Sequence, residues 1–115
     1  MPTPASKKDL PPGTLDMLIL RTLSLGSLHG YAIAQHIERI SDQVFNVEQG
    51  SLYPALERLL NAGWVTSRWG KSPTGRRARY YTLTRSGRKQ LGQEISRYDQ
   101  LSLAIARILG REPEA

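Results

Sequence analysis

The chain has 115 residues, a formal net charge of +6 and no cysteine. This length suits one domain around a single modest core, with little room for an internal active-site cleft. The lack of cysteine excludes disulfides, thiolate metal sites and cysteine nucleophiles. No apolar run approaches the roughly 18 residues of a membrane span, and the N-terminus lacks the apolar region of a signal peptide. We therefore expect a cytoplasmic protein with no membrane partner, no metal and no cofactor.

Residues 1–13 contain four of the seven prolines and a lysine pair, which predicts a flexible N-terminal arm. Thr14 is the expected N-cap of a first helix, and Asp16 in its first turn suits the helix dipole. This helix is apolar over much of its circumference and is expected to end at Gly26. It should therefore lie at the centre of the core.

A second helix is expected over residues 31–40, after a short turn at residues 27–30. Its isoleucines lie on one face and its polar side chains on the other. Residues 41–48 then form a connector. Its segment 44–47 is expected to make either a very short strand or an apolar plug for the core.

A third helix is predicted over residues 49–60, with the sequence QGSLYPALERLL. Its leucines recur at i, i+4, i+7 and i+8, which places them in one apolar stripe. Gly63 suits the left-handed position that closes a helix. The polar N-terminal part, with a projecting Tyr53, is typical of a recognition helix.

Residues with a preference for strands fill positions 64–69 and 79–83, around a basic, turn-forming stretch at 70–75. This pattern predicts an antiparallel hairpin that must pack against the helices to be stable. Thr84 is expected to cap a last helix over residues 85–109, which a flexible tail at 110–115 follows.

The predicted order α-α-α-β-β-α is that of a winged helix-turn-helix, a mainly α fold with a small β-hairpin. We assign residues 14–84 to this domain and residues 85–109 to a C-terminal dimerisation helix. An apolar stripe of about five turns, roughly 25 Å long, supports the second assignment. A compact three-helix core cannot cover a stripe of that length, so two copies are expected to pack their stripes together in an isologous contact. The alternative is a helix that folds back wholly onto its own domain. The stripe consists of Leu91, Ile95, Tyr98, Leu101, Ile105 and Ile108.

The charges are segregated along the chain. No acidic residue occurs between Glu57 and Glu94, whereas this interval holds nine of the sixteen basic residues. Such a distribution favours a polyanionic partner. A solvated basic surface without a partner is the alternative.

Three stretches, LHGYAIAQHI, QGSLYPALERLLNAGWV and RRARYYTLTRSGRKQL, together resemble the PadR family of bacterial transcriptional regulators. The resemblance covers nearly the whole chain. The chain is similar to the short subgroup of the family, in which a single C-terminal helix performs dimerisation. It implies a sequence-specific regulator of double-stranded DNA, a dimeric repressor that a small aromatic effector relieves.

Two groups of residues are expected to contact DNA. Gln49, Ser51 and Tyr53 lie near the N-terminus of the third helix, the part that comes closest to base edges in the major groove. The resemblance also places Tyr31 near the DNA backbone. For the two tyrosines, ordinary packing with an exposed hydroxyl is the alternative. The hairpin contributes arginines suited to phosphate or to a narrow minor groove, and a lysine that adds a point charge: Arg76, Arg77, Arg79 and Lys71.

The resemblance further implies an effector cleft between the last helix and its mate in a dimer. Tyr98 would line this cleft with Leu15, Leu91 and Ile95. Plain packing of Tyr98 in the dimer is the alternative. The remaining stripe residues would complete the dimer interface: Leu101, Ile105 and Ile108.

Other classes of function are weaker. An enzyme is not expected, because the chain has only two histidines and no acidic cluster near them to complete a metal or acid–base site. His29 is expected to cap a turn and His36 to lie on the surface, while Trp64 and Trp69 should pack in the core or on the hairpin. A winged-helix adaptor that binds proteins without specific DNA binding remains the alternative function, because a fold does not fix a function. An RNA-binding winged helix would need exposed aromatic side chains that stack on unpaired bases, and only the tyrosines are candidates for this.

Overall fold

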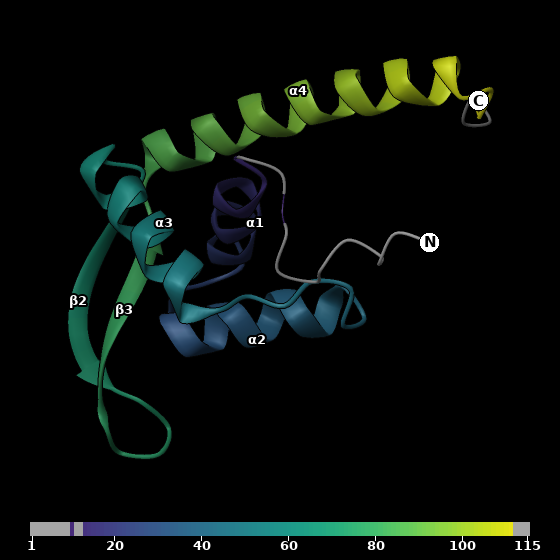
Figure 1. The fold of residues 1–115 in the computed structure, drawn as a ribbon. Coiled ribbons are helices and arrows are strands. Elements are labelled where there is room, and N and C mark those ends of the chain that lie inside the picture. Colours follow the sequence, from purple (N-terminus) through teal and green to yellow (C-terminus); the bar gives the residue numbers. More distant parts are fainter. Residues whose placement is uncertain (1–9, 11–12, 112–115) are drawn as a thin grey trace.

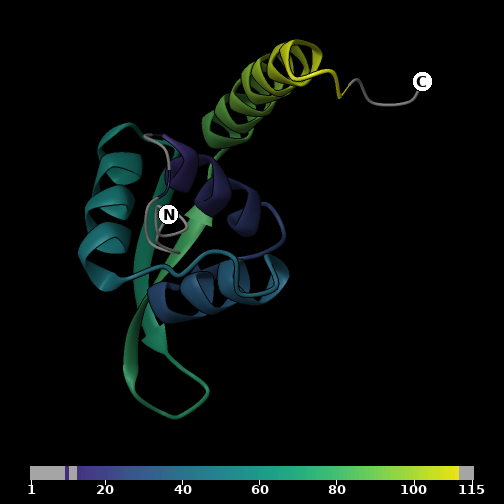
Figure 2. The same ribbon diagram turned by 45° about the vertical axis from the view of Figure 1, so that its right-hand side comes forward.

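The structure is a computed structural model that describes residue 10 and residues 13–111 (Figure 1). Most of the predicted arm at residues 1–13 and four of the six residues of the predicted tail at 110–115 therefore lie outside the described residues. Three helices and a small sheet enclose the core, and a long fourth helix leaves it (Figures 1 and 2). The helices are α1 Thr14–Leu23, α2 Gly30–Ile40, α3 Gln49–Asn61 and α4 Arg85–Ile108.

Helix α1 differs from its prediction at both ends. Its N-cap is Gly13, and Thr14 is already helical, so the prediction of a threonine cap is wrong. Gly13 has a φ of 82°, a left-handed conformation that glycine adopts without steric strain. The helix ends at Leu23, three residues before the predicted stop at Gly26.

The sheet has three strands and not the two that the sequence predicted. Strand β1 Leu28–His29 occupies the expected turn at 27–30 and pairs antiparallel with β3 Arg77–Leu83. Strand β3 also pairs with β2 Val65–Lys71, which gives the order β1-β3-β2. The hairpin strands are longer than predicted because the ladder continues to the pair Lys71↔Arg77. We call this β2–β3 hairpin, with its loop, the wing.

The connector between α2 and α3 forms no strand, and two of its apolar residues serve as a plug, whereas Val44 is 61% exposed. Val47 is buried and Phe45 packs against the core. The backbone N–H of Val47 donates a hydrogen bond of 2.9 Å to a carboxylate oxygen of Glu38 on α2. This bond holds the connector in place just before α3 begins.

The core consists of residues from every helix and strand except the two-residue β1. Its fully buried side chains are mostly leucine and isoleucine from α1, α2 and α3, and the sheet closes one side with Val65, Tyr81 and Leu83. Of the leucines predicted to form the stripe of α3, Leu52 and Leu59 are among those that are buried. The predicted orientation of α3 is therefore confirmed.

The end of α3, the wing and the start of α4 meet at one junction. Gly63 has the predicted left-handed conformation, with a φ of 78°. The Thr84 hydroxyl donates to the Gly63 carbonyl at 2.8 Å and accepts the N–H of Gly87 at 3.0 Å, which confirms Thr84 as the N-cap of α4. A Cβ atom at Gly87 would overlap the carbonyl oxygen of Trp64 and come within 2.6 Å of Leu83 Cδ1. The junction therefore requires glycine at position 87.

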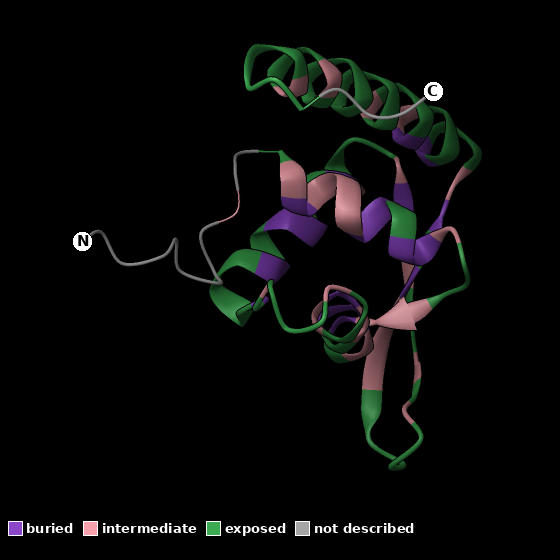
Figure 3. Cartoon of the chain, turned by 90° about the vertical axis from the view of Figure 1, so that its right-hand side faces the viewer, coloured by how far each residue is buried: buried purple, intermediate pink, exposed green. Residues whose placement is uncertain are grey.

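Most of α4 projects beyond the rest of the domain (Figure 1), and most of this helix is exposed (Figure 3). Leu91 is buried, but the stripe residues after it are exposed, by 38% at Ile95, 58% at Leu101 and 85% at Ile108. The alternative in which this helix folds back wholly onto its own domain is thus wrong. Within residues 13–111, neither α4 nor any other helix combines the length and apolar character that crossing a membrane requires.

Replacing Gly87 with alanine should destabilise the protein by about 2–3 kcal/mol, because backbone and side-chain atoms must move to make room. Chemical denaturation monitored by circular dichroism measures this. Gly92→Ala is the matched control, since Gly92 lies in the same helix and an added Cβ meets nothing within 4 Å. Equal stability of the two variants would show that the junction is not tightly packed.

Candidate nucleic-acid interface

The first turn of α3 presents polar groups to solvent. Its N-cap, Glu48, makes no side-chain cap hydrogen bond, and Gln49, Gly50 and Ser51 are exposed. The opposite face of the helix is fixed in the core by residues that include Leu52. The polar N-terminal turn is therefore held outward on a rigid element.

Tyr53 and Tyr31 are exposed by 43% and 66%, and they belong to α3 and to the start of α2. A Cβ atom at Gly30 would lie 2.9 Å from the Tyr53 hydroxyl oxygen, so the tyrosine ring fits against the bare backbone of α2. His29, expected to cap a turn, is the N-cap of α2, because its Nδ1 atom accepts the N–H of Ala32 at 3.2 Å. These contacts fix the relative position of α2 and α3 at their exposed ends.

Beyond the helices, the wing carries exposed cations. Lys71, Arg76 and Arg77 are exposed. The guanidinium carbon of Arg77 lies 4.4 Å from the ring centroid of Trp69, a cation–π contact. Trp69 is 58% exposed, so it packs on the hairpin and not in the core. The stacking holds the Arg77 side chain along the wing.

Arg79 has a different environment from the other wing arginines. Its Nε atom donates to the Ser67 hydroxyl at 2.9 Å, and its Nη1 atom lies 3.4 Å from a carboxylate oxygen of Glu57 on α3. Its guanidinium also lies 5.7 Å from the ring centroid of Tyr81. Burial raises the pKa of the Tyr81 hydroxyl, and the charge of Arg79 lowers it by less. Tyr81 is therefore an uncharged phenol at neutral pH.

A hollow of about 400 Å³ lies between the wing and the starts of α2 and α3. Four aromatic side chains and two arginines contribute to it: Tyr31, Tyr53, Trp69, Tyr81, Arg77 and Arg79. A second hollow shares Tyr31 and Tyr53 and includes Gln49. Predicted site residues from three elements thus lie around one region. Lys71 lines a separate hollow with Trp69 and Arg77, whereas Ser51 and Arg76 are exposed outside all three.

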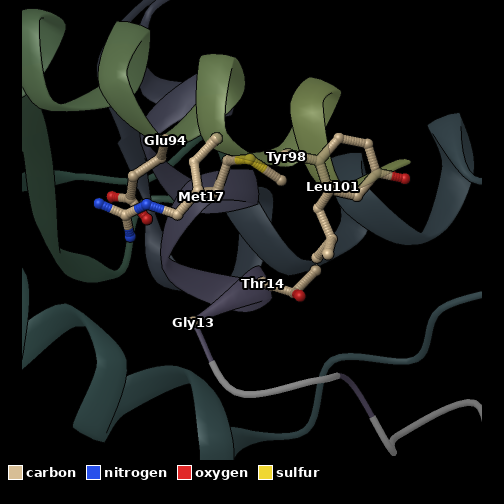
Figure 4. Close-up of a pocket in the computed structure, with 7 residues that line it drawn as sticks. Gly13, Thr14, Met17, Glu94, Tyr98 and Leu101 are labelled. Carbon is tan, nitrogen blue, oxygen red and sulfur yellow. The ribbon is translucent and has the colours of Figure 1, made fainter. Parts of the chain in front are cut away.

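A separate hollow of about 150 Å³ lies between α1 and α4 (Figure 4). Its lining is Gly13, Thr14, Met17, Glu94, Arg97, Tyr98 and Leu101. Of the four predicted cleft residues only Tyr98 is in this lining. Leu15 and Leu91 are buried in the core. Ile95 is an exposed residue of α4 that does not line the hollow. Sequence reasoning missed Met17, whose position two residues after Leu15 on α1 gave no sign that it faces α4.

No three histidine, aspartate or glutamate side chains come together as a metal site within the described part of the chain. The geometry instead joins a pair of helices, α2 and α3, to a basic β-hairpin, with exposed polar and aromatic side chains on the second helix. This arrangement defines the winged helix-turn-helix class of DNA-binding proteins.

Comparison with known proteins gives the family. The model of the Transcriptional regulator PadR-like family matches residues 19–93. The chain belongs to this family, which consists of transcriptional regulators and not of enzymes. The resemblance seen in the sequence is thereby confirmed.

Two relatives show how far the similarity extends. A transcriptional regulator from Clostridium thermocellum shares 28% sequence identity with a TM-score of 0.76, over 83% of this chain and 92% of that one. The negative transcriptional regulator PadR of Bacillus subtilis is 30% identical over 87 residues, which are 76% of this chain and 48% of the relative. A crystal structure of Bacillus subtilis PadR in complex with operator DNA aligns with a TM-score of 0.65. The chain therefore matches about half the length of that relative.

Replacing Gly30 with alanine should push the Tyr53 ring away from α2, because the new Cβ would come within 2.9 Å of its hydroxyl oxygen. The ring lies at the end of a flexible side chain, so the fold should survive and the ring should move. Nuclear Overhauser contacts between residue 30 and the Tyr53 ring measure this. Gly50→Ala, where an added Cβ meets nothing within 4 Å, should leave them intact. Unchanged contacts in Gly30→Ala would contradict the packing of Tyr53 against α2.

Proposed function

We propose that this protein is a sequence-specific regulator that binds double-stranded operator DNA as a homodimer and represses transcription. The observation that carries the proposal is that Tyr31 and Tyr53 line one hollow with the basic wing and a second hollow with Gln49. A helix of ordinary diameter fits the major groove, and its N-terminal residues then face base edges. The operator complex of Bacillus subtilis PadR supports this assignment, because that protein shares the fold.

The contacts divide into two kinds. Gln49 is suited to a bidentate contact with adenine, and Ser51 and Tyr53 to base edges or phosphate. The hydroxyl of Tyr31 is suited to the DNA backbone. The wing cations supply charge that attracts phosphate whatever the sequence, and their guanidinium groups suit phosphate or a narrow minor groove. Helix α3 thus specifies the sequence, while the wing adds affinity.

The homodimer follows from α4, whose stripe includes Leu101, Ile105 and Ile108. These side chains are 58%, 47% and 85% exposed in the single chain. Stripes of two copies packed against each other would remove them from water in an isologous contact. Such a dimer presents two wings and two recognition helices, which suits an operator with two half-sites. Residues 14–84 then act as the DNA-binding domain and residues 85–109 as the dimerisation helix.

Fluorescence anisotropy tests the function directly. The purified protein is titrated with duplex DNA from upstream of its own gene and with a scrambled duplex, each at two salt concentrations. A dissociation constant of about 10 nM or below for the upstream duplex, with at least about a thousandfold preference over the scrambled one, is expected for a specific regulator. Weak binding that is equal for both duplexes and lost with salt would leave the protein–protein adaptor as the function.

Replacing Arg76 and Arg77 together with alanine should weaken binding to all duplexes and lower the slope of log affinity against log salt by about one or two, since each phosphate contact releases counterions. The preference for the upstream duplex should remain. The same anisotropy titrations measure both quantities. An unchanged slope would remove the wing from the mechanism.

Replacing Ile105 with lysine should convert the dimer to a monomer without unfolding the domain, because Ile105 is exposed in the single chain. The lysine charge would be buried if the two stripes still packed together. Sedimentation velocity measures the mass, and operator affinity should fall by at least about tenfold because the two half-sites no longer bind together. Ser96→Lys is the control, since Ser96 lies nine residues away on the opposite face of α4. A dimer that survives Ile105→Lys would contradict the proposed interface.

We include in this proposal a small aromatic effector that binds beside Tyr98 and releases the operator. The hollow there is small, about 150 Å³, and a second copy of α4 would enlarge and enclose it. The probe is 4-hydroxybenzoate at saturating concentration. It should lower operator affinity and change tryptophan fluorescence; if it changes neither, control by this compound is excluded.

A reporter gene under the upstream promoter tests repression. It should be expressed more strongly when the gene for this protein is deleted.

A further inference from the structure

Arg79 lies where the wing leaves the helical body. The register Val65↔Leu83 and Trp69↔Arg79 places these four residues on one face of the hairpin, which turns toward the helices at its base. Val65 and Leu83 are buried at that base, whereas Trp69, paired with Arg79, is 58% exposed. The boundary between the buried and the exposed part of this face thus falls at Arg79.

One guanidinium group joins three elements at this boundary. Arg79 on β3 donates to Ser67 on β2 at 2.9 Å and pairs with Glu57 on α3 at 3.4 Å. The planar fork of arginine suits two such directed contacts at once, which lysine cannot reproduce. The wing is thereby tied to the recognition helix through side chains as well as through its buried base.

The charge of Glu57 is hard to explain on a surface that binds phosphate. Glu57 lines the hollow between the wing and α3, and it is the last acidic residue before the acid-free interval. A carboxylate at this place repels a polyanion and opposes the attraction of Arg79. To contact phosphate with its full charge, Arg79 would have to leave Glu57 and Ser67. The pair of Arg79 and Glu57 is therefore better suited to holding the wing against α3 than to attracting phosphate.

We propose that Arg79 is a positioning residue that fixes the angle between the wing and α3 through Glu57, and that it does not contact DNA phosphate. This inference rests on the proposed DNA-binding function. It separates Arg79 from Arg76 and Arg77, which have no carboxylate in contact within the described ion pairs. The neighbouring Arg58 makes a similar contact to another element, Asp16 of α1, at 2.7 Å. The recognition helix is thus tied to the wing and to α1 by consecutive residues.

The two roles predict opposite effects for Glu57→Ala. Removal of a negative charge from a phosphate-facing surface should tighten DNA binding, whereas loss of the link should weaken it. We expect operator affinity to fall by up to about fivefold, the upper end for an exposed ion pair, with an unchanged salt slope. Arg79→Ala and Arg79→Lys should give similar losses, because the charge alone does not restore the link. Arg76→Ala is the matched control and should lower the slope by about one.

A second measurement needs no DNA. Residual dipolar couplings of backbone amides in the free protein report the orientation and order of the wing relative to α1, α2 and α3. In the wild type, β2 and β3 should fit the same alignment tensor as the helices. In Glu57→Ala and Arg79→Ala the wing should fit a smaller tensor, while the thermal transition stays near that of the wild type because exposed ion pairs contribute little stability.

Three results would overturn the inference: tighter binding by Glu57→Ala, a lower salt slope for Arg79→Ala equal to that of Arg76→Ala, or wing couplings that neither variant changes. Failure of the proposed function has a different result, since the wild type would then show no preference for the upstream duplex. Even if the protein did not bind the upstream duplex specifically, the dipolar couplings would still decide whether the Arg79–Glu57 pair positions the wing.

Discussion

The close contact between Gly87 and the backbone of Trp64 is the constraint on which the arrangement of this protein depends. At this point the end of α3, Trp64 just before the wing, the last residue of β3 and the first turn of α4 come together. Thr84 joins them further, because its hydroxyl bonds Gly63 and its N–H bonds the Trp64 carbonyl at 3.0 Å. A residue with a side chain at position 87 would separate α4 from the wing. The angle at which α4 projects is therefore set by the same atoms that hold the base of the wing.

The distribution of charge gives the two surfaces of the molecule different chemistry. The wing and the outer face of α3 combine cations with exposed aromatic rings, while the exposed stripe of α4 is apolar. Three carboxylates of the helices make directed contacts: Glu57 with Arg79, Asp16 with Arg58 and Glu38 with the connector. Each of these carboxylates holds an element that positions α3. These three carboxylates thus serve the structure.

Local patterns in the sequence were enough to predict the helices and the hairpin, because helical periodicity, the Thr84 cap and Gly63 act over a few residues. Strand β1 was missed since two residues carry no periodicity, and Leu28 becomes a strand residue only by pairing with Tyr81. The link from Arg79 to Glu57 was also missed, because it joins residues that are distant in the sequence. The position of Glu57 at the edge of the acid-free interval was nevertheless a usable signal. Leu15 and Leu91 are buried in the core of the single chain, which the sequence did not reveal because a stripe on one helix does not show which of its residues the neighbouring helix covers. Their place beside a cleft in a dimer stays a prediction.

The position of β3 at the centre of the sheet has a consequence for biosynthesis. Strand β3 pairs with both other strands, yet it is the last strand to leave the ribosome. While the nascent chain ends before residue 77, α1, α2 and α3 lack the wall formed by Tyr81 and Leu83, and β1 has no partner. Leu91 of α4 closes the same core later still. Folding that proceeds from the N-terminus during translation must therefore wait for the final third of the chain, and an arrested chain of three helices exposes its leucines to chaperones.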